Sequence, residues 1–123
     1  MGGNRQNIES DYKYPEQYKV ILSKDAVEDI KQIKQYILLK FKYKEYAENF
    51  SIQIKSAINA LRVFTKACCR TEYIIEGYEI FYKPHSTYLI FFIIDGSNVI
   101  VIRILKDKMH WQSVIERMQK INL

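Results

Sequence analysis

Four residues in the second half of the chain have the side-chain types that cleave a phosphodiester bond. His110 could serve as a general acid, because an unperturbed imidazole titrates near neutral pH. Glu79 could serve as the general base. Arg103 and Lys83 could hold the phosphate and stabilise the negative charge that develops on it, a role for which Lys108 is a further candidate. Together these residues would form a nuclease site.

Both histidines also have a simpler interpretation, which we favour. His110 precedes packing residues of the last predicted helix, so it is expected as a partly exposed residue of the first helical turn. His85 follows Pro84 in a predicted turn and is expected at the surface. A catalytic function of the chain is therefore an open alternative, and the residue types lean against it.

Arg103 interrupts an otherwise apolar predicted strand, where an unpaired charge would be costly. It therefore needs either a partner or an exposed face. One possibility is a structural ion pair with a helix carboxylate, Glu28 or Asp29. The other is a direct functional contact, and the sequence favours neither.

Several kinds of site are missing from the sequence. There is no His-x-x-His or Cys-x-x-Cys spacing and no glycine-rich phosphate loop, so we expect neither a metal nor another cofactor. Cys68 and Cys69 are adjacent and cannot form the usual structural disulfide with each other. We expect both to be buried by packing, in a protein of the reducing cytoplasm.

The charge balance is basic, with a formal net charge of +5 and a pI of about 9.1. Such a surface attracts polyanions or acidic partners, although many unrelated proteins are equally basic. No apolar run approaches the roughly 20 residues that a membrane span requires, so we expect no membrane association. Residues 1–16 are polar and aperiodic, and are predicted to be a flexible leader before a single domain of residues 17–123.

Apolar residues at three- and four-residue steps predict two helices joined by a tight turn near Tyr43 and Lys44. Ser23 is suited to cap the first of them. The apolar stripes are Val27, Ile30, Ile33, Ile37 and Phe41 in the first helix, and Tyr46, Phe50, Ile54, Ile58, Leu61 and Phe64 in the second.

Strands are predicted at residues 18–22, 78–83, 87–94 and 98–105, and a last helix at residues 109–121. Pro84 is expected to end the second strand, and Asp95-Gly96 is a hairpin-turn signal. The third strand should be buried on both faces. The order β-α-α-β-β-β-α predicts an α+β fold in which a helical hairpin covers one face of an antiparallel sheet.

This order and several local motifs resemble the RelE/ParE family of toxins. Residues 18–37 are similar to the family's first strand and its Ala-x-x-Asp-Ile helix, carried here by Ala26, Asp29 and Ile30. Residues 88–92 (YLIFF) resemble its Tyr-hydrophobic-hydrophobic-Phe-Tyr strand, and residues 101–105 (VIRIL) its strand ending in Arg-Ile-Leu. Residues 108–111 (KMHW) look like a variant of the Arg-Met-Asp-Trp segment of ParE-like members.

The resemblance implies a toxin of a toxin–antitoxin system that inhibits growth and is silenced by a cognate antitoxin. ParE-like members inhibit DNA gyrase by binding it, whereas RelE-like members cleave mRNA in the ribosome without a metal. In RelE-type sites several Lys and Arg lie on the sheet, but this chain has Leu89, Glu79 and Phe81 at positions where basic residues are expected. We therefore favour the ParE-like branch, with the RelE-like endoribonuclease as the alternative.

Contacts with the target or the antitoxin are expected at Lys106, Lys108, Trp111 and Tyr82. Trp111 is more readily interpreted as the packing anchor of the last helix. The partners implied are the antitoxin and either DNA gyrase or the ribosome with mRNA, in the cytoplasm. The chain could also form a homodimer or a toxin–antitoxin hetero-oligomer.

Overall fold

The computed structural model describes residues 17–63 and 69–123. The predicted leader, Phe64 and Cys68 lie outside these ranges. The elements, in chain order, are β1 (Lys19–Leu22), α2 (Lys24–Phe41), α3 (Lys44–Asn59), the 3-10 turn η1 (Ala60–Val63), β2 (Cys69–Ile75), β3 (Tyr78–His85), β4 (Tyr88–Asp95), β5 (Asn98–Lys106) and α4 (Trp111–Arg117). The predicted α+β class is confirmed.

The sheet has the order β1-β5-β4-β3-β2. Strands β2 to β5 form an antiparallel meander, whereas β1 pairs in parallel with β5, from Lys19 opposite Asn98 to Leu22 opposite Val101. The expectation of a purely antiparallel sheet is thus corrected in one respect. The long connection through the helical hairpin and three strands returns β5 alongside β1, and such a crossover permits the parallel direction.

Strand β2 was not predicted, and the meander therefore has one strand more than expected. The turn between β2 and β3 is Glu76-Gly77, with φ of 51° and 85°, which matches a type I′ hairpin turn. Glutamate is not a usual first residue of that turn. A bulge between Arg70 and Ile74, with Glu72 at a φ of 69°, also breaks the alternation by which a strand is recognised.

Pro84 does not end β3, which continues to His85, one residue before the β3–β4 turn. In the described residues the register between β2 and β3 begins at Cys69 opposite Tyr82, so the segment around Pro84 pairs with β4 alone. A missing N–H costs little where a strand has a neighbour on one side only. The prediction that Pro84 terminates the strand was therefore wrong.

Helix α4 is shorter than the predicted span of 109–121, because the last residues make tertiary hydrogen bonds instead of helical ones. The Ile121 N–H donates to Glu76 Oε2 at 2.7 Å, and the Lys24 N–H donates to the Asn122 carbonyl at 2.7 Å. The Asn122 side-chain amide donates to Asp25 Oδ2 at 3.0 Å. These bonds tie the tail after α4 to the β2–β3 turn and to the start of α2.

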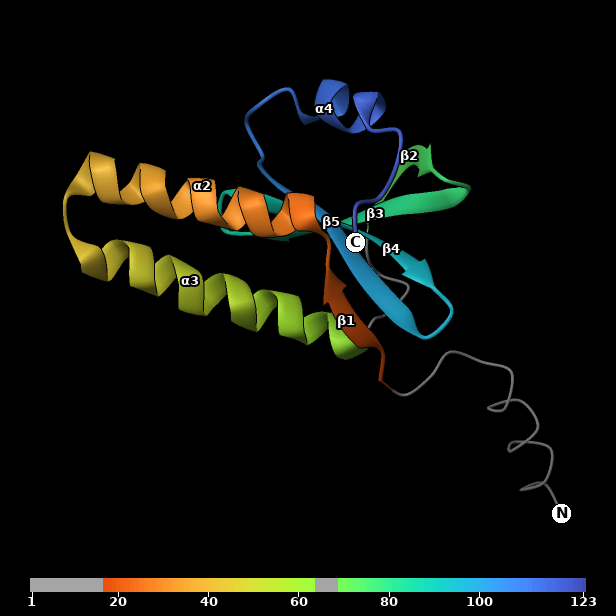
Figure 1. The fold of residues 1–123 in the computed structure, drawn as a ribbon, viewed down its shortest axis with the longest axis horizontal. Coiled ribbons are helices and arrows are strands. Elements are labelled where there is room, and N and C mark those ends of the chain that lie inside the picture. Colours follow the sequence, from red (N-terminus) through yellow and green to blue (C-terminus); the bar gives the residue numbers. More distant parts are fainter. Residues whose placement is uncertain (1–16, 64–68) are drawn as a thin grey trace, which may run out of the picture.

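The sheet is a central layer with a core on each face, as Figure 1 shows, where the α2–α3 hairpin and α4 lie on different sides of it. Ile90 and Phe92 of β4 pack towards the hairpin, while Leu89, Phe91 and Ile93 pack towards α4. The prediction that this strand is buried on both faces is confirmed. Burial of a phenylalanine side chain contributes roughly 1.5–3 kcal/mol, so β4 carries much of the stability.

Helix α2 begins as predicted, because the Ala26 N–H donates to Ser23 Oγ at 3.1 Å. Two members of its predicted apolar stripe are nevertheless exposed, Val27 by 51% and Phe41 by 46%. In Figure 1 the joint between α2 and α3 lies beyond the strands, and Phe41 is the last residue of α2. Ala26 and Asp29 are buried in α2 instead.

Candidate functional site

Strand β5 is longer than its neighbour β1, so its outer edge needs other hydrogen-bond partners beyond Val101. Residues at the start of α2 supply them. The Ser23 N–H donates to the Val101 carbonyl at 2.9 Å, and Ser23 Oγ donates to the Ile102 carbonyl at 3.2 Å. Asp29 Oδ2 then accepts the Ile104 N–H at 2.8 Å. Ser23, the N-cap of α2, and Asp29 thus continue along β5 the pairing that β1 begins.

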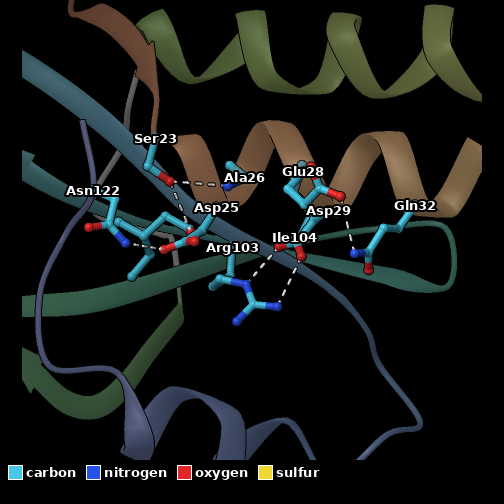
Figure 2. Close-up of polar contacts among 10 residues, drawn as sticks. Ser23, Asp25, Ala26, Glu28, Asp29, Gln32, Arg103, Ile104 and Asn122 are labelled. Carbon is cyan, nitrogen blue, oxygen red and sulfur yellow. Dashed lines mark hydrogen bonds and ion pairs between the residues drawn. The ribbon is translucent and has the colours of Figure 1, made fainter.

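Arg103 is bound at the same edge by Asp29, as Figure 2 shows. Its Nε lies 2.7 Å from Asp29 Oδ2 and its Nη2 lies 2.9 Å from Asp29 Oδ1. The hydrogen bond to Asp29 raises the pKa of Arg103, and burial of the guanidinium opposes this shift. The structural ion pair that the sequence suggested is therefore present. Glu28, the other suggested partner, accepts a hydrogen bond from Gln32.

A bulge in the β4–β5 ladder decides which way Arg103 points. Phe91 pairs with Arg103 and Phe92 with Val101, so Ile102 is an extra residue on β5. Cross-strand partners share a face of the sheet. The Arg103 side chain therefore leaves β5 on the same face as Phe91, which is the face that α4 covers. Asp29 balances the positive charge that Arg103 brings to this edge of the sheet.

The remaining nuclease candidates do not converge on Arg103. Lys83 pairs with Ile90, which places it on the face of the helical hairpin, opposite to the face of Arg103. Glu79 is on the same face as Lys83 and forms a bidentate pair with Arg70, with distances of 2.8 and 3.0 Å. His110 is exposed and shares a hydrogen bond of 3.1 Å between its Nδ1 and Ser113 Oγ. The structure therefore brings no two of the four candidates together.

Tyr82 and Trp111 belong to an aromatic cluster on the α4 face of the sheet. Their ring centroids are 5.9 Å apart, and Trp111 lies 5.2 Å from Phe91 and 6.5 Å from Tyr73. Trp111 thus anchors α4 to the sheet, as its simpler interpretation predicted. The pKa of Tyr82 is raised, first by a hydrogen bond to Cys69 and then by burial.

Cys69 is exposed at the start of β2, and the prediction that it is buried was wrong. The prediction failed because β2 itself was missed. As the outermost strand of the sheet, β2 has no neighbour on one side among the described residues. The same prediction for Cys68 falls outside the described residues.

Lys106 is part of a surface that sequence reasoning missed. Its Nζ lies 4.4 Å from the ring centroid of Tyr36, and Lys40 Nζ lies 5.6 Å from the same ring. These residues line a groove between the far half of α2, the start of α3 and the end of β5. The i, i+4 spacing of Tyr36 and Lys40 was the available signal, but the contact with Lys106 depends on the fold. Lys108 is exposed in the segment after β5.

Among the residues that the structure describes, no three His, Cys, Asp or Glu side chains are grouped so that they could hold a metal ion. In the same part of the chain, no helix has the length and apolar character that crossing a membrane would need.

A solved structure titled "Chromosomal ParDE TA system from P. aeruginosa" matches the chain with a TM-score of 0.61, at 15% sequence identity, over 75% of this chain and 98% of that one. At this identity the likeness concerns the fold. Comparison with curated protein sequences finds no match.

Residues 20–111 match the family model described as "ParE toxin of type II toxin-antitoxin system, parDE". The chain therefore belongs to the ParE toxin family, and it is the toxin component of a type II toxin–antitoxin system. The resemblance that the motifs suggested is confirmed. The matched region runs from β1 to the first residue of α4, and it includes both Asp29 and Arg103.

Proposed function

We propose that this toxin acts by binding DNA gyrase, without catalytic residues of its own, and that a cognate antitoxin silences it by covering its surface. The observation that carries the proposal is the commitment of Arg103 to Asp29 through two short hydrogen bonds. A cation that already holds a carboxylate is poorly placed to stabilise a phosphorane. Glu79 and Lys83 lie on the face of the sheet opposite to that of Arg103, which supports the same proposal.

The basic character of the chain suits this role. A basic surface attracts DNA, the polyanion on which gyrase works, and it attracts an acidic antitoxin. We expect the toxin to act in the cytoplasm, where both partners are found. Lys106, Lys108, Tyr82 and Trp111 stay candidates for contacts with either partner. Of these, Lys106 and Lys108 are the exposed ones, while Tyr82 and Trp111 are half-buried.

The test is a supercoiling assay with purified gyrase, relaxed plasmid and the purified toxin. We expect supercoiling to be inhibited and cleaved DNA to accumulate, and we expect both effects to disappear when the antitoxin is added in excess. Absence of inhibition at toxin concentrations that saturate the antitoxin would overturn the proposal.

The alternative activity is a ribosome-dependent cleavage of mRNA through Lys83, Arg103 and His110. It is tested by primer extension on an mRNA that is being translated in the presence of the toxin. We expect no cuts in the ribosomal A site. Cuts that are lost in His110→Ala and retained in Ser113→Ala would instead assign a nuclease role to the imidazole, because Ser113 is its hydrogen-bond partner in the last helix.

A further inference from the structure

A groove with a volume of about 550 Å³ lies between the hairpin and the sheet, at the end of the molecule away from Asp29. Helix α2 forms one wall, and the β3–β4 turn with the end of β5 forms the other. The lining residues are Tyr36, Ile37, Lys40, Phe41, Tyr46, Thr87, Tyr88 and Lys106. They come from the neighbouring helices α2 and α3 and from two segments far away in the sequence, the start of β4 and the end of β5.

A second hollow of about 300 Å³ continues the groove along α2 towards Arg103. Tyr36 and Lys106 line both hollows and stand between them. The two hollows therefore form one trough, which begins at the exposed end of the hairpin and ends at the Asp29–Arg103 pair. A trough of this length suits an extended or helical segment of another chain better than a small molecule.

The larger hollow is electropositive. Lys40 and Lys106 line it, and no acidic side chain among the described residues does. The field acts on Tyr36, whose pKa is lowered first by a hydrogen bond to Lys40 and then by the charges of Lys40 and Lys106. A carboxylate brought into this hollow would be attracted by the same two ammonium groups.

Exposed aromatic rings surround the lysines. Phe41 and Tyr46 are 46% and 51% exposed, and their ring centroids are 5.3 Å apart in an edge-to-face arrangement. Tyr43, which is 63% exposed, packs edge-to-face on Tyr46 at 5.8 Å. Exposed rings gathered in this way, next to a hollow, are typical of a surface that a protein partner covers.

The arrangement of the cations distinguishes between the two polyanionic kinds of partner. Lys106 Nζ covers the Tyr36 ring, and Lys40 Nζ lies 5.5 Å from the Phe41 ring centroid. Single-stranded nucleic acid needs open ring faces on which bases can stack. Here ammonium groups lie over the Tyr36 and Phe41 rings, where they can meet carboxylates but leave little room for a base. The groove is therefore better suited to an acidic peptide.

We propose that the groove receives an acidic segment of a protein partner, with one apolar side chain of that segment in the hollow between Phe41 and Tyr88. Carboxylates on either side of that side chain would pair with Lys40 and Lys106. This inference deepens the proposed function, on which it rests, by naming the surface and the chemistry through which the toxin holds a protein.

The test is a binding measurement that needs neither gyrase nor antitoxin. Fluorescein-labelled short peptides, in which glutamates flank a central leucine, phenylalanine or tryptophan, are titrated with the full chain and followed by anisotropy. A peptide with lysines in place of the glutamates, and a single-stranded oligonucleotide, serve as comparison probes. We expect at least one of the acidic peptides to bind, with the lysine peptide not binding.

The lysines are tested by charge reversal with a matched control. The double variant Lys40→Glu with Lys106→Glu should weaken peptide binding by about tenfold or more, because two attractions become repulsions. The double variant Lys31→Glu with Lys34→Glu changes the net charge equally, but these exposed lysines of α2 line a different hollow, against Ala47. The affinity of this control variant for the acidic peptide should stay within about twofold of that of the unaltered chain. Circular dichroism checks that both variants fold.

Four results would overturn the proposal: no binding of any acidic peptide, equal weakening by both double variants, oligonucleotide binding that the Lys40/Lys106 variant abolishes, or a homodimer in light scattering that this variant dissociates. Failure of the gyrase assay with intact peptide binding would remove the proposed target and leave the groove assignment standing. Inhibition of gyrase without any peptide binding would remove only the groove assignment.

Discussion

Two arginine–carboxylate pairs in this toxin have nearly the same geometry but lie in very different places. Arg103 and Asp29 are 2.7 Å apart at their nearest atoms, and Arg70 and Glu79 are 2.8 Å apart. The side chains of the first pair are 24% and 9% exposed, those of the second 68% and 32%. The first joins a helix to a strand 74 residues away, whereas the second links neighbouring strands of one hairpin.

The comparison shows that the contact distance of an ion pair does not determine how much the pair contributes to the stability of the fold. Asp29 also accepts the Ile104 N–H, so its carboxylate is part of the hydrogen bonding of the sheet. Removing it would leave a largely buried guanidinium and a buried N–H without an acceptor. The Arg70–Glu79 pair is far more exposed, so water can take the place of either partner. The Asp29 pair therefore fixes how α2 lies against the sheet, and the Glu79 pair adds little to the fold.

The largest expected effect comes from Asp29→Ala. We expect it to lower the free energy of unfolding by about 3 kcal/mol, the lower end of the range for a broken buried pair, because Arg103 keeps some access to water. Urea denaturation followed by circular dichroism measures the loss. Glu28→Ala is the control, since this exposed neighbour loses only its hydrogen bond with Gln32. Equal losses in the two variants would contradict the assigned role of Asp29.

A smaller effect is expected at the outer pair. A double-mutant cycle with Arg70→Ala and Glu79→Ala should give a coupling energy of about 0.2–1 kcal/mol. It should fall further when the salt concentration is raised, because exposed charges are screened. The measurement is again urea denaturation, at low and high salt. A coupling as large as that of Asp29 and Arg103 would show that burial is not what separates the two pairs.

The smallest effect concerns the titration of Tyr36 and leaves the stability at neutral pH unchanged. Its pKa is lowered by Lys40 and Lys106, whereas burial raises that of nearby Tyr88. Because the folded chain releases the Tyr36 proton at lower pH than the unfolded chain does, any contribution to stability appears in alkaline solution and is lost as the pH falls. Carbon-13 NMR of labelled tyrosine should show Tyr36 ionising before Tyr88.

The variant Lys40→Gln should raise the pKa of Tyr36 towards its ordinary value, since it removes the hydrogen bond and the charge of Lys40. Lys34→Gln, on another face of the same helix, should leave the titration in place. An unchanged Tyr36 titration in Lys40→Gln would mean that the groove is not electropositive in the way described.

The sequence predicted the fold where local patterns and tertiary packing agree. Strand β4 follows from a continuous apolar run. The Asp95-Gly96 signal also predicted a hairpin here, although Asp95 still pairs with Asn98 and the turn residues are Gly96, with a φ of 62°, and Ser97. Strand β2 was missed because its polar residues, its bulge and the Glu76-Gly77 turn weaken each local signal. The end of α4 could not be predicted, because bonds to Glu76 and Asp25 compete with the helix only in the folded chain.

In the candidate site too, some features could be predicted from the sequence and others depend on the folded chain. The partner of Arg103 could be narrowed to two carboxylates, because a buried charge demands one and the first helix must pack on the last strand. The groove could not be found, because Tyr36, Phe41, Tyr88 and Lys106 meet only after a hairpin and a meander are placed together. Phe41 was assigned to the core because periodicity does not reveal where the sheet beneath a helix ends.

Within the described residues the two edge strands of the sheet are β1, with 4 residues, and the longer β2, with 7 residues. Strand β2 is a poor template for adding another strand. Glu72 sits in left-handed backbone at a bulge, and the charged Arg70 is 68% exposed beside it. Such features discourage edge-to-edge pairing of copies. Concentrated solutions of the toxin should therefore resist fibre formation, and straightening β2 by replacing Glu72 with a β-branched residue is where that resistance would first be lost.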